Sequence, residues 1–368
     1  MDSPSIEPAC RTTILAPHHG FYCPPTPARP KVGRTSDHGR PGTCERSWVK
    51  TSAGIWIRPW YVSGLTPTAV GGSRLQTVGG LNTRRYHGLL VAALDSPAGR
   101  VACLASIQET ATVGPQSLEL GCNVYNDTIH PRGYRYLEHV QLEPYPIFTY
   151  RIDGVSLEKH VSTLFGPNAV AVAYRSSSAI DLALRPLVAM RDFHHVSRTN
   201  GLIDGTPTAK NCRTTFNPYS ILPEIHFDLL SGTFDPTAYW YYNFSYPFEA
   251  YRGLDPIEDL YSPGEWRCHV TPDTPVEFVT SVGEAVPPNE VFSLANVEKR
   301  RRIESHQSLT EQIEDDFEQA LTRASRSFVV RRKQWALHHP SGLPLVWGLG
   351  PGHHDRPSRS DPRHPTIP

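Results

Sequence analysis

The sequence predicts a mainly β protein: a large antiparallel β-sandwich followed by a linker helix. Two observations lead to this fold class. The first is a series of short segments between Leu89 and Val282 that are apolar or alternate in polarity, with turn residues between them. The second is a change to helical periodicity near Ser308. Together they indicate one large β domain with a helix after it.

The expected strands follow one another at the spacing of hairpins. Asp153 and Gly154 separate two of them, as in a two-residue turn. Glycine has no Cβ and therefore tolerates the positive φ that such a turn requires. Many short strands joined in this way favour an antiparallel sandwich. The strand segments are LLVAAL, IFTYRI, VSLEKHV, AVAVAYRS, IDLALRPLV, EIHFDLL and PVEFVTSV.

The helix is expected within residues 301–333. Ser308 and Glu311 have the spacing of a capping box, in which the two side chains satisfy backbone N–H groups of the first turn. Apolar residues then recur every three or four positions and share one helical face. They are Leu309, Ile313, Phe317, Ala320, Leu321, Ala324 and Phe328.

Composition narrows the function classes. The chain has 36 basic and 36 acidic residues among 368, so we expect no nucleic-acid partner and no membrane partner. No apolar run reaches the ~20 residues of a membrane span, and no secretory signal is expected. Seven dispersed cysteines indicate free thiols in a reducing compartment, which predicts a cytoplasmic protein.

Four motifs stand in order along the middle of the chain. They are TVGGLNTRRYHGLLVAAL (77–94), HPRGYRYLEHVQLEPYPIFTYRIDGVSLEK (130–159), RPLVAMRDFHH (185–195) and YWYYNFSYPFEAYRGLDPIEDLYSPG (239–264). Together they resemble the N-terminal domain of bacterial and archaeal glycogen debranching enzymes of the amylo-α-1,6-glucosidase type. The resemblance implies a supersandwich-like domain over 77–300 and a linker helix over 301–333 that leads toward an (α/α) barrel absent from this chain.

The two ends differ from the middle in being crowded with Pro, His and Arg and in lacking periodicity. One interpretation is a disordered tail at each end. Another is a shifted reading frame: the codons for VWGLGPGHHDRP (346–357) can encode WFGDWGRDTMIA, which resembles the motif opening the family's catalytic domain. We therefore expect an irregular, out-of-frame segment at 1–76 and an out-of-frame tail at 334–368, with lineage-specific extensions as the alternative. The nucleotide sequence at the codons for Gln76 and Gln334 decides between them.

The resemblance implies a role in glycogen or α-glucan degradation, by α-1,6-glucosidase and 4-α-glucanotransferase activities. Glycoside hydrolysis uses two carboxyl groups across the scissile bond, and in the family the glucosidase pair belongs to the barrel. We therefore expect a truncated debranching enzyme that is inactive alone. The alternatives are a non-catalytic glucan-binding module and a non-functional fragment.

Candidate acids for glucan transfer stand beside the aromatic run of the fourth motif. They are Glu249, Asp255, Glu258 and Asp259. A general acid needs a pKa raised by burial or by a like charge. The alternative is that these carboxylates pair with Arg252 or cap a turn.

Candidate glucan-binding residues are planar donors and aromatic rings, which suit a neutral sugar. The same residues would equally serve an interface with the missing barrel, or pack the sandwich core. On a strand, at most half of the aromatic run can line one groove. The candidates are Asn82, Arg84, Arg85, Tyr86, His87, Trp240, Tyr241, Tyr242 and Arg252.

A metal site and a cofactor are not expected. Asp192, His194 and His195 form a short cluster, but a metal site needs three or four converging ligands. The segment GGLNTRRYHG does not have the glycine spacing of a dinucleotide-binding loop. The sequence leaves the oligomeric state open.

Overall fold

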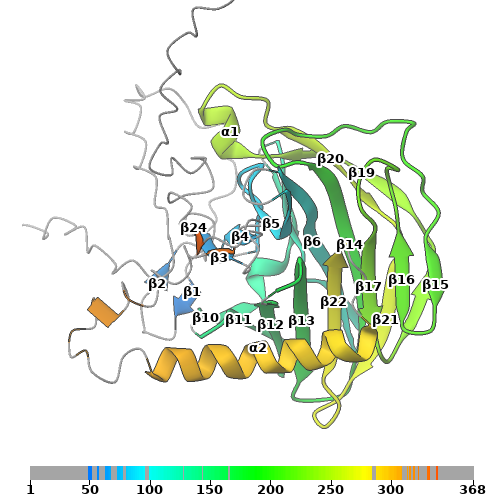
Figure 1. Cartoon of the computed structure of the whole chain (residues 1–368). Helices are drawn as coiled ribbons and strands as arrows, with labels where there is room; N and C mark the ends of the chain where they lie inside the picture. The colour runs from blue at the N-terminus through cyan, green and yellow to red at the C-terminus, as the bar shows by residue number, and fades with distance from the viewer. Residues whose placement is uncertain are drawn as a thin grey trace, which may run out of the picture.

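The computed structural model describes residues 80–308 apart from 96–98, 127, 143, 165 and 284–286 (Figure 1). It also describes 49–51, 56–57, 63–67, 73–77, 313, 315, 318–319, 322, 330–331 and 337–338. Most of the two ends predicted to be irregular, 1–76 and 334–368, lies outside the described residues. No helix in the described part is both long and apolar enough to cross a membrane.

Two large sheets form the molecule, which confirms the mainly β class. The described strands of sheet A pair in antiparallel fashion, except that β1 runs parallel to β10. In spatial order, its described strands are β15 (Thr208–Lys210), β16 (Arg213–Phe216), β17 (Ile225–Leu229), β22 (Val276–Val282), β13 (Ala169–Ser176), β12 (Val155–Thr163), β11 (Ile147–Ile152), β10 (Leu137–Gln141), β1 (Val49–Thr51) and β2 (Trp56–Ile57).

Sheet B packs against sheet A, and its loops carry most of the candidate site residues. Its main path is β18 (Thr233–Asp235), β21 (Glu265–Val270), β14 (Ile180–Asp192), β6 (Gly99–Val113), β5 (Gly88–Asp95), β4 (Ser73–Thr77) and β3 (Ser63–Pro67). Three further strands join this sheet: β20 (Ile257–Ser262), which pairs with β14 and with β19 (Tyr239–Ser245), and β7 (Gln116–Glu119), which pairs with β6.

Smaller elements complete the described fold. The hairpin β8 (Cys122–Tyr125) and β9 (Thr128–Arg132) is followed by the short 3-10 helix η1 (Gly133–Arg135). The others are α1 (Pro247–Tyr251), α2 (Pro288–Ser308), β23 (Val330–Arg331) and β24 (Leu337–His338). The cysteines of the described domain, Cys103, Cys122, Cys212 and Cys268, are free thiols.

The core lies between the sheets because alternate residues of each strand point to opposite faces. Trp266 of sheet B packs against two aromatic rings of sheet A, with ring centroids 5.0 Å from Phe227 and 5.4 Å from Phe278. All three rings are buried in one cluster with aliphatic side chains of both sheets. Each such aromatic pair adds about 0.5–1.5 kcal/mol beyond the burial of its area, so this cluster is a main tie between the layers.

The turn at Asp153 and Gly154 has the geometry that the sequence predicts. Both residues have positive φ, 46° and 81°, and Ile152 pairs with Val155 across the turn. A two-residue turn with two positive φ values matches the right-handed twist of the flanking strands. It therefore fixes the register of β11 against β12.

Helix α2 lies across the outer face of sheet A (Figure 1). Phe292 and Ala295 pack on Ala171 and Val279, and Arg302 donates a hydrogen bond of 3.1 Å to the Thr163 carbonyl. The sequence did not predict α2, which ends at Ser308, the residue expected to cap the next helix. The apolar positions expected after Ser308 lie for the most part outside the described residues.

An ion pair is buried between the sheets. Glu109 of β6 faces Lys159 of β12 in a salt bridge, with 4% and 9% of the two side chains exposed. The Tyr174 hydroxyl donates a hydrogen bond of 2.8 Å to the same carboxylate. Burial and the Glu109 charge hold the pKa of Tyr174 well above its usual value, so the phenol stays a donor. These partners satisfy a charge that is costly to bury alone.

Removing one partner of this pair should destabilise the fold strongly. Lys159→Met leaves the Glu109 carboxylate buried without its cation, which typically costs about 3–5 kcal/mol. The double variant Glu109→Gln and Lys159→Met keeps an acceptor for Tyr174 and should recover much of this loss. Urea unfolding of the parent and both variants measures the effect.

Arg151→Ala is the matched control, because its partner Glu138 is half exposed and such pairs contribute about 0–1 kcal/mol. An equal loss in the control and in Lys159→Met would contradict the assigned role of the buried pair.

Candidate functional site

The carboxylate of Glu249 is the point at which three of the candidate residues meet. Glu249 lies on α1, between β19 and β20, and its side chain is fully buried. Arg84 Nε lies 3.4 Å from one of its oxygens, while Arg85 Nη2 and Arg252 Nη1 lie 3.2 Å and 3.3 Å from the other. Three guanidinium groups therefore share one carboxylate.

The loop between β4 and β5 holds its two arginines through backbone hydrogen bonds. Gly80 turns the chain with a φ of 79°, and the Thr77 hydroxyl donates to the Leu81 carbonyl at 2.7 Å. The Asn82 amide donates to the Ala105 carbonyl of β6 at 3.0 Å. The Thr83 carbonyl accepts from the Phe248 N–H of α1 at 3.2 Å. These contacts tie the loop to the sheet and to α1 together.

His87 fixes the same loop from inside. The Thr83 N–H donates to His87 Nδ1 at 3.1 Å, and the ring is buried. The pKa of His87 is lowered to about 3, mainly by burial and to a smaller extent by the neighbouring Arg84 charge. A hydrogen bond with the backbone of Leu81 opposes the shift. The imidazole is therefore neutral at physiological pH, which suits a hydrogen-bond acceptor and not a proton donor to substrate.

The ring of Tyr86 anchors the loop on the outer face of sheet B. It meets Phe193 edge to face at a centroid distance of 5.3 Å, inside an apolar cluster with residues of β5, β6 and β14. The guanidinium groups of Arg84 and Arg85 lie 5.3 Å and 5.9 Å from its centroid. Tyr86 thus supports the arginines by cation–π contact while it is itself buried.

A second buried carboxylate, Glu258 of β20, has a complete set of donors. Arg191 holds it with two nitrogens, one of them at 2.8 Å, and the Tyr246 hydroxyl and the Ser197 N–H complete the shell. Arg191 also donates to the Arg85 carbonyl at 2.8 Å. The Glu249 and Glu258 clusters are therefore one connected network.

Arg191 was not among the residues singled out from sequence, and Tyr246 was considered there only as part of the aromatic run and not as a partner of an acid. The signal was present but weak: both lie inside the quoted motifs, and a buried acid needs a cation close to it. Sequence spacing alone cannot pair Arg191 with an acid 67 positions later.

The two remaining candidate acids, Asp255 and Asp259, also accept hydrogen bonds from neighbouring groups. The N–H of Ile257 donates to Asp255 and holds its pKa below the usual value, and Arg198 at 2.9 Å adds to the effect. Burial raises the pKa of Asp259, but hydrogen bonds from the N–H groups of Thr199 and Asn243 outweigh it and the net shift is downward. Both carboxylates are therefore held in the ionised form.

The aromatic run on β19 divides between the two faces of sheet B. Trp240 turns inward and packs on Tyr261 with ring centroids 5.2 Å apart. Tyr239 and Tyr241 lie on the other face, with their hydroxyls 2.9 Å apart. A register shift follows Tyr241, and the exposed Tyr242 lies within it. The alternation expected from the sequence is confirmed, and it leaves the tyrosines, not Trp240, on the outer face.

Asp192, His194 and His195 form a turn. The His194 N–H donates to the Asp192 carboxylate at 2.8 Å, and His195 Nδ1 lies 3.5 Å from the same group. In the part of the chain that the structure describes, no group of three His, Cys, Asp or Glu side chains is placed to hold a metal ion. The cluster caps the end of β14.

Replacing Glu249 should destabilise the loops above sheet B. Glu249→Gln leaves Arg84 and Arg85 buried without their counter-charge, and losing one partner of such a pair typically costs about 3–5 kcal/mol. Arg252→Ala should cost far less, because its side chain is 40% exposed. Urea unfolding of the two variants compares these costs, and equal midpoints would contradict the dependence on Glu249.

His87 should make the fold sensitive to acid. Its folded pKa of about 3 lies below the unfolded value of 6.5, so the unfolded chain binds the extra proton first. The stabilising contribution is present above pH 6.5 and is lost as the pH falls toward 3.

The matched variant His87→Asn keeps an acceptor near Nδ1 without a titrating ring. Between pH 6 and pH 4 the stability of the parent should fall by about 1.4 kcal/mol per pH unit more than that of the variant. Unfolding curves at several pH values measure both slopes, and parallel slopes would show that His87 is not responsible.

Comparison with known proteins gives a family for this architecture. The sequence profile described as "Glycogen debranching enzyme N terminal" matches residues 65–277, more than half of the chain. Comparison with curated protein sequences found no match.

Two solved structures resemble the fold distantly. A bacterial glucoamylase in complex with acarbose is 9% identical with a TM-score of 0.35, over 73% of this chain and 37% of its own. A putative kojibiose phosphorylase from the human microbiome is 7% identical with a TM-score of 0.27, over 71% of this chain and 35% of its own. This chain thus spans little more than a third of either protein. On the match of its own sequence over residues 65–277, it belongs to the family of glycogen debranching enzyme N-terminal domains.

Proposed function

We propose that this chain binds branched α-glucan as the N-terminal domain of a glycogen debranching enzyme and does not itself hydrolyse it. The observation that carries this proposal is the state of the candidate acids. Glu249 and Glu258 are buried in salt bridges, while Asp255 and Asp259 have lowered pKa values. A general acid for glycoside cleavage needs the opposite shift. The arrangement supports binding over acid–base chemistry.

The role of the whole protein follows from its family. We propose that it degrades glycogen in the cytoplasm by removing α-1,6 branches, with 4-α-glucan transfer as its second activity. Both activities need catalytic groups beyond the described domain. The outward tyrosines of β19 and the hydroxyl-bearing face of sheet B support the domain's share of this work, because aromatic faces and neutral donors suit a sugar.

A second candidate role concerns the arginine loop, which serves as an interface with another domain. Among the described residues, Asn82 Oδ1, Thr83 Oγ1 and Arg85 Nε are buried without a hydrogen-bond partner. Buried polar atoms in native proteins nearly always have one. Three such atoms on one loop favour a polar partner docking there over an open sugar groove.

The binding function predicts a clear pair of results. The purified chain should be retarded in a gel that contains glycogen, and it should release no glucose from a branched limit dextrin. A coupled glucose assay measures the second, with an active debranching enzyme as the positive control.

Glucose release that Glu249→Gln or Asp255→Asn abolishes would overturn the non-catalytic assignment. A chain that unfolds cooperatively but is not retarded would reject the binding function. A chain without a cooperative transition would instead match a non-functional fragment.

A further inference from the structure

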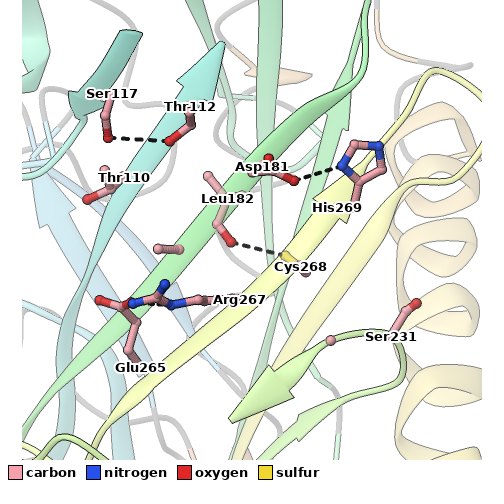
Figure 2. Close-up of a pocket in the computed structure, with 12 residues that line it drawn as sticks. Thr110, Thr112, Ser117, Asp181, Leu182, Ser231, Glu265, Arg267, Cys268 and His269 are labelled. Carbon is pink, nitrogen blue, oxygen red and sulfur yellow. Dashed lines mark hydrogen bonds and ion pairs between the residues drawn. The ribbon is translucent and has the colours of Figure 1, made fainter. Parts of the chain in front are cut away.

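A polar hollow of about 770 Å³ opens on the outer face of sheet B, away from the arginine loop (Figure 2). This size lies within the ~300–1,000 Å³ of small-ligand sites. Hydroxyl groups of Thr110, Thr112 and Ser117 line one side, and the Thr112 and Ser117 oxygens are 3.3 Å apart. Strands β14 and β21 and the turn before β18 supply the rest.

The charged groups of the hollow are in contact with polar or oppositely charged partners. Asp181 of β14 pairs with His269 of β21 at 2.8 Å, and Glu265 pairs with Arg267 at 2.9 Å (Figure 2). An anion or a cation would have to compete with a paired group of its own sign. Hydroxyls and paired carboxylates still offer both donors and acceptors. Such a surface suits an uncharged ligand with many hydroxyl groups.

The hollow continues to the tyrosines of β19 through one buried arginine. Asp181, Ala183 and Arg185 alternate along β14 and share its outer face, with regular pairing to β6 over this stretch. Arg185 Nη2 donates to Glu265, which lines the hollow, at 3.0 Å. Its guanidinium lies 4.5 Å from the centroid of the Tyr239 ring.

Tyr239 is therefore a braced aromatic surface next to the hollow. Its ring is tilted against Tyr241 at 5.0 Å, and 44% of the residue is exposed. Arg185 also donates to the Thr237 carbonyl at 2.8 Å and so fixes the segment that leads into β19. A ring held in this way can meet the apolar face of a pyranose at low entropic cost.

We propose that the hollow and Tyr239 together form a subsite for a linear α-1,4-linked glucan segment. One sugar stacks on Tyr239, and the neighbouring units place their hydroxyls among Asp181, Glu265 and Thr110. This inference rests on the proposed function, since it names the surface on which the glucan lies. It places that surface on β6, β14 and β21 and not at the arginine loop.

Two variants of the full chain test the subsite. Tyr239→Ala removes the stacking face, and Ala183→Trp fills the hollow while every charged residue that lines it is kept. Each should weaken the binding of maltohexaose, measured by calorimetry, about tenfold or more, which corresponds to ~1.4 kcal/mol. Tyr251→Ala is the matched control, because this tyrosine of α1 is 77% exposed and lies on the arginine-loop side. It should bind like the parent.

Hydrogen exchange of the parent chain gives an independent readout that does not depend on any variant folding. Saturating maltohexaose should slow exchange in β21 and in the first half of β14. A parent that binds while both folded variants keep its affinity, or protection confined to residues 80–87 and α1, would overturn the subsite and leave the proposed function intact. A parent that binds neither maltohexaose nor glycogen would reject the proposed function itself.

Discussion

The salt bridge between Arg85 and Glu249 is the interaction on which the loops above sheet B depend. The two groups lie 164 positions apart in sequence and meet in a buried site. Arg85 also donates to the His194 carbonyl and accepts from Arg191, which in turn holds Glu258. One residue thus joins the β4–β5 loop, the turn after β14 and helix α1 through its side chain, and strand β20 through its carbonyl and Arg191. Such a network is rigid only while each charge keeps its partner.

This network explains why acidic residues in a sugar-processing family need not be catalytic. A carboxylate that accepts several charge-assisted hydrogen bonds is stabilised in its ionised form and gives up its capacity to deliver a proton. Asp255 and Asp259, whose pKa values are lowered by such hydrogen bonds, are in this state. Glu258 accepts hydrogen bonds from Arg191, Tyr246 and Ser197 and so ties β20 to its neighbours.

The outer face of sheet B has two parts with different physical character. Around Tyr86 it is apolar, covered by loops and bordered by arginines that share the Glu249 carboxylate. Around Asp181 it is open, polar and charge-balanced, with Tyr239 at its edge. A ligand that removes water from polar groups must replace the lost hydrogen bonds. The first kind of surface therefore suits a protein partner, and the second suits a neutral sugar. The proposed interface and the proposed binding surface thus lie on different parts of one sheet.

The sequence by itself determined the mainly β class, the turn at Asp153 and Gly154 and the alternation of β19, because strand period and turn geometry are local properties. It did not indicate α2, since the apolar face of this helix is short and its position is set by contact with sheet A. Only the tertiary structure paired Arg85 with Glu249, buried the Glu109 and Lys159 charges, and brought Tyr239 beside the hollow. These contacts join strands distant in sequence, and no local pattern encodes which distant partner a buried charge will meet.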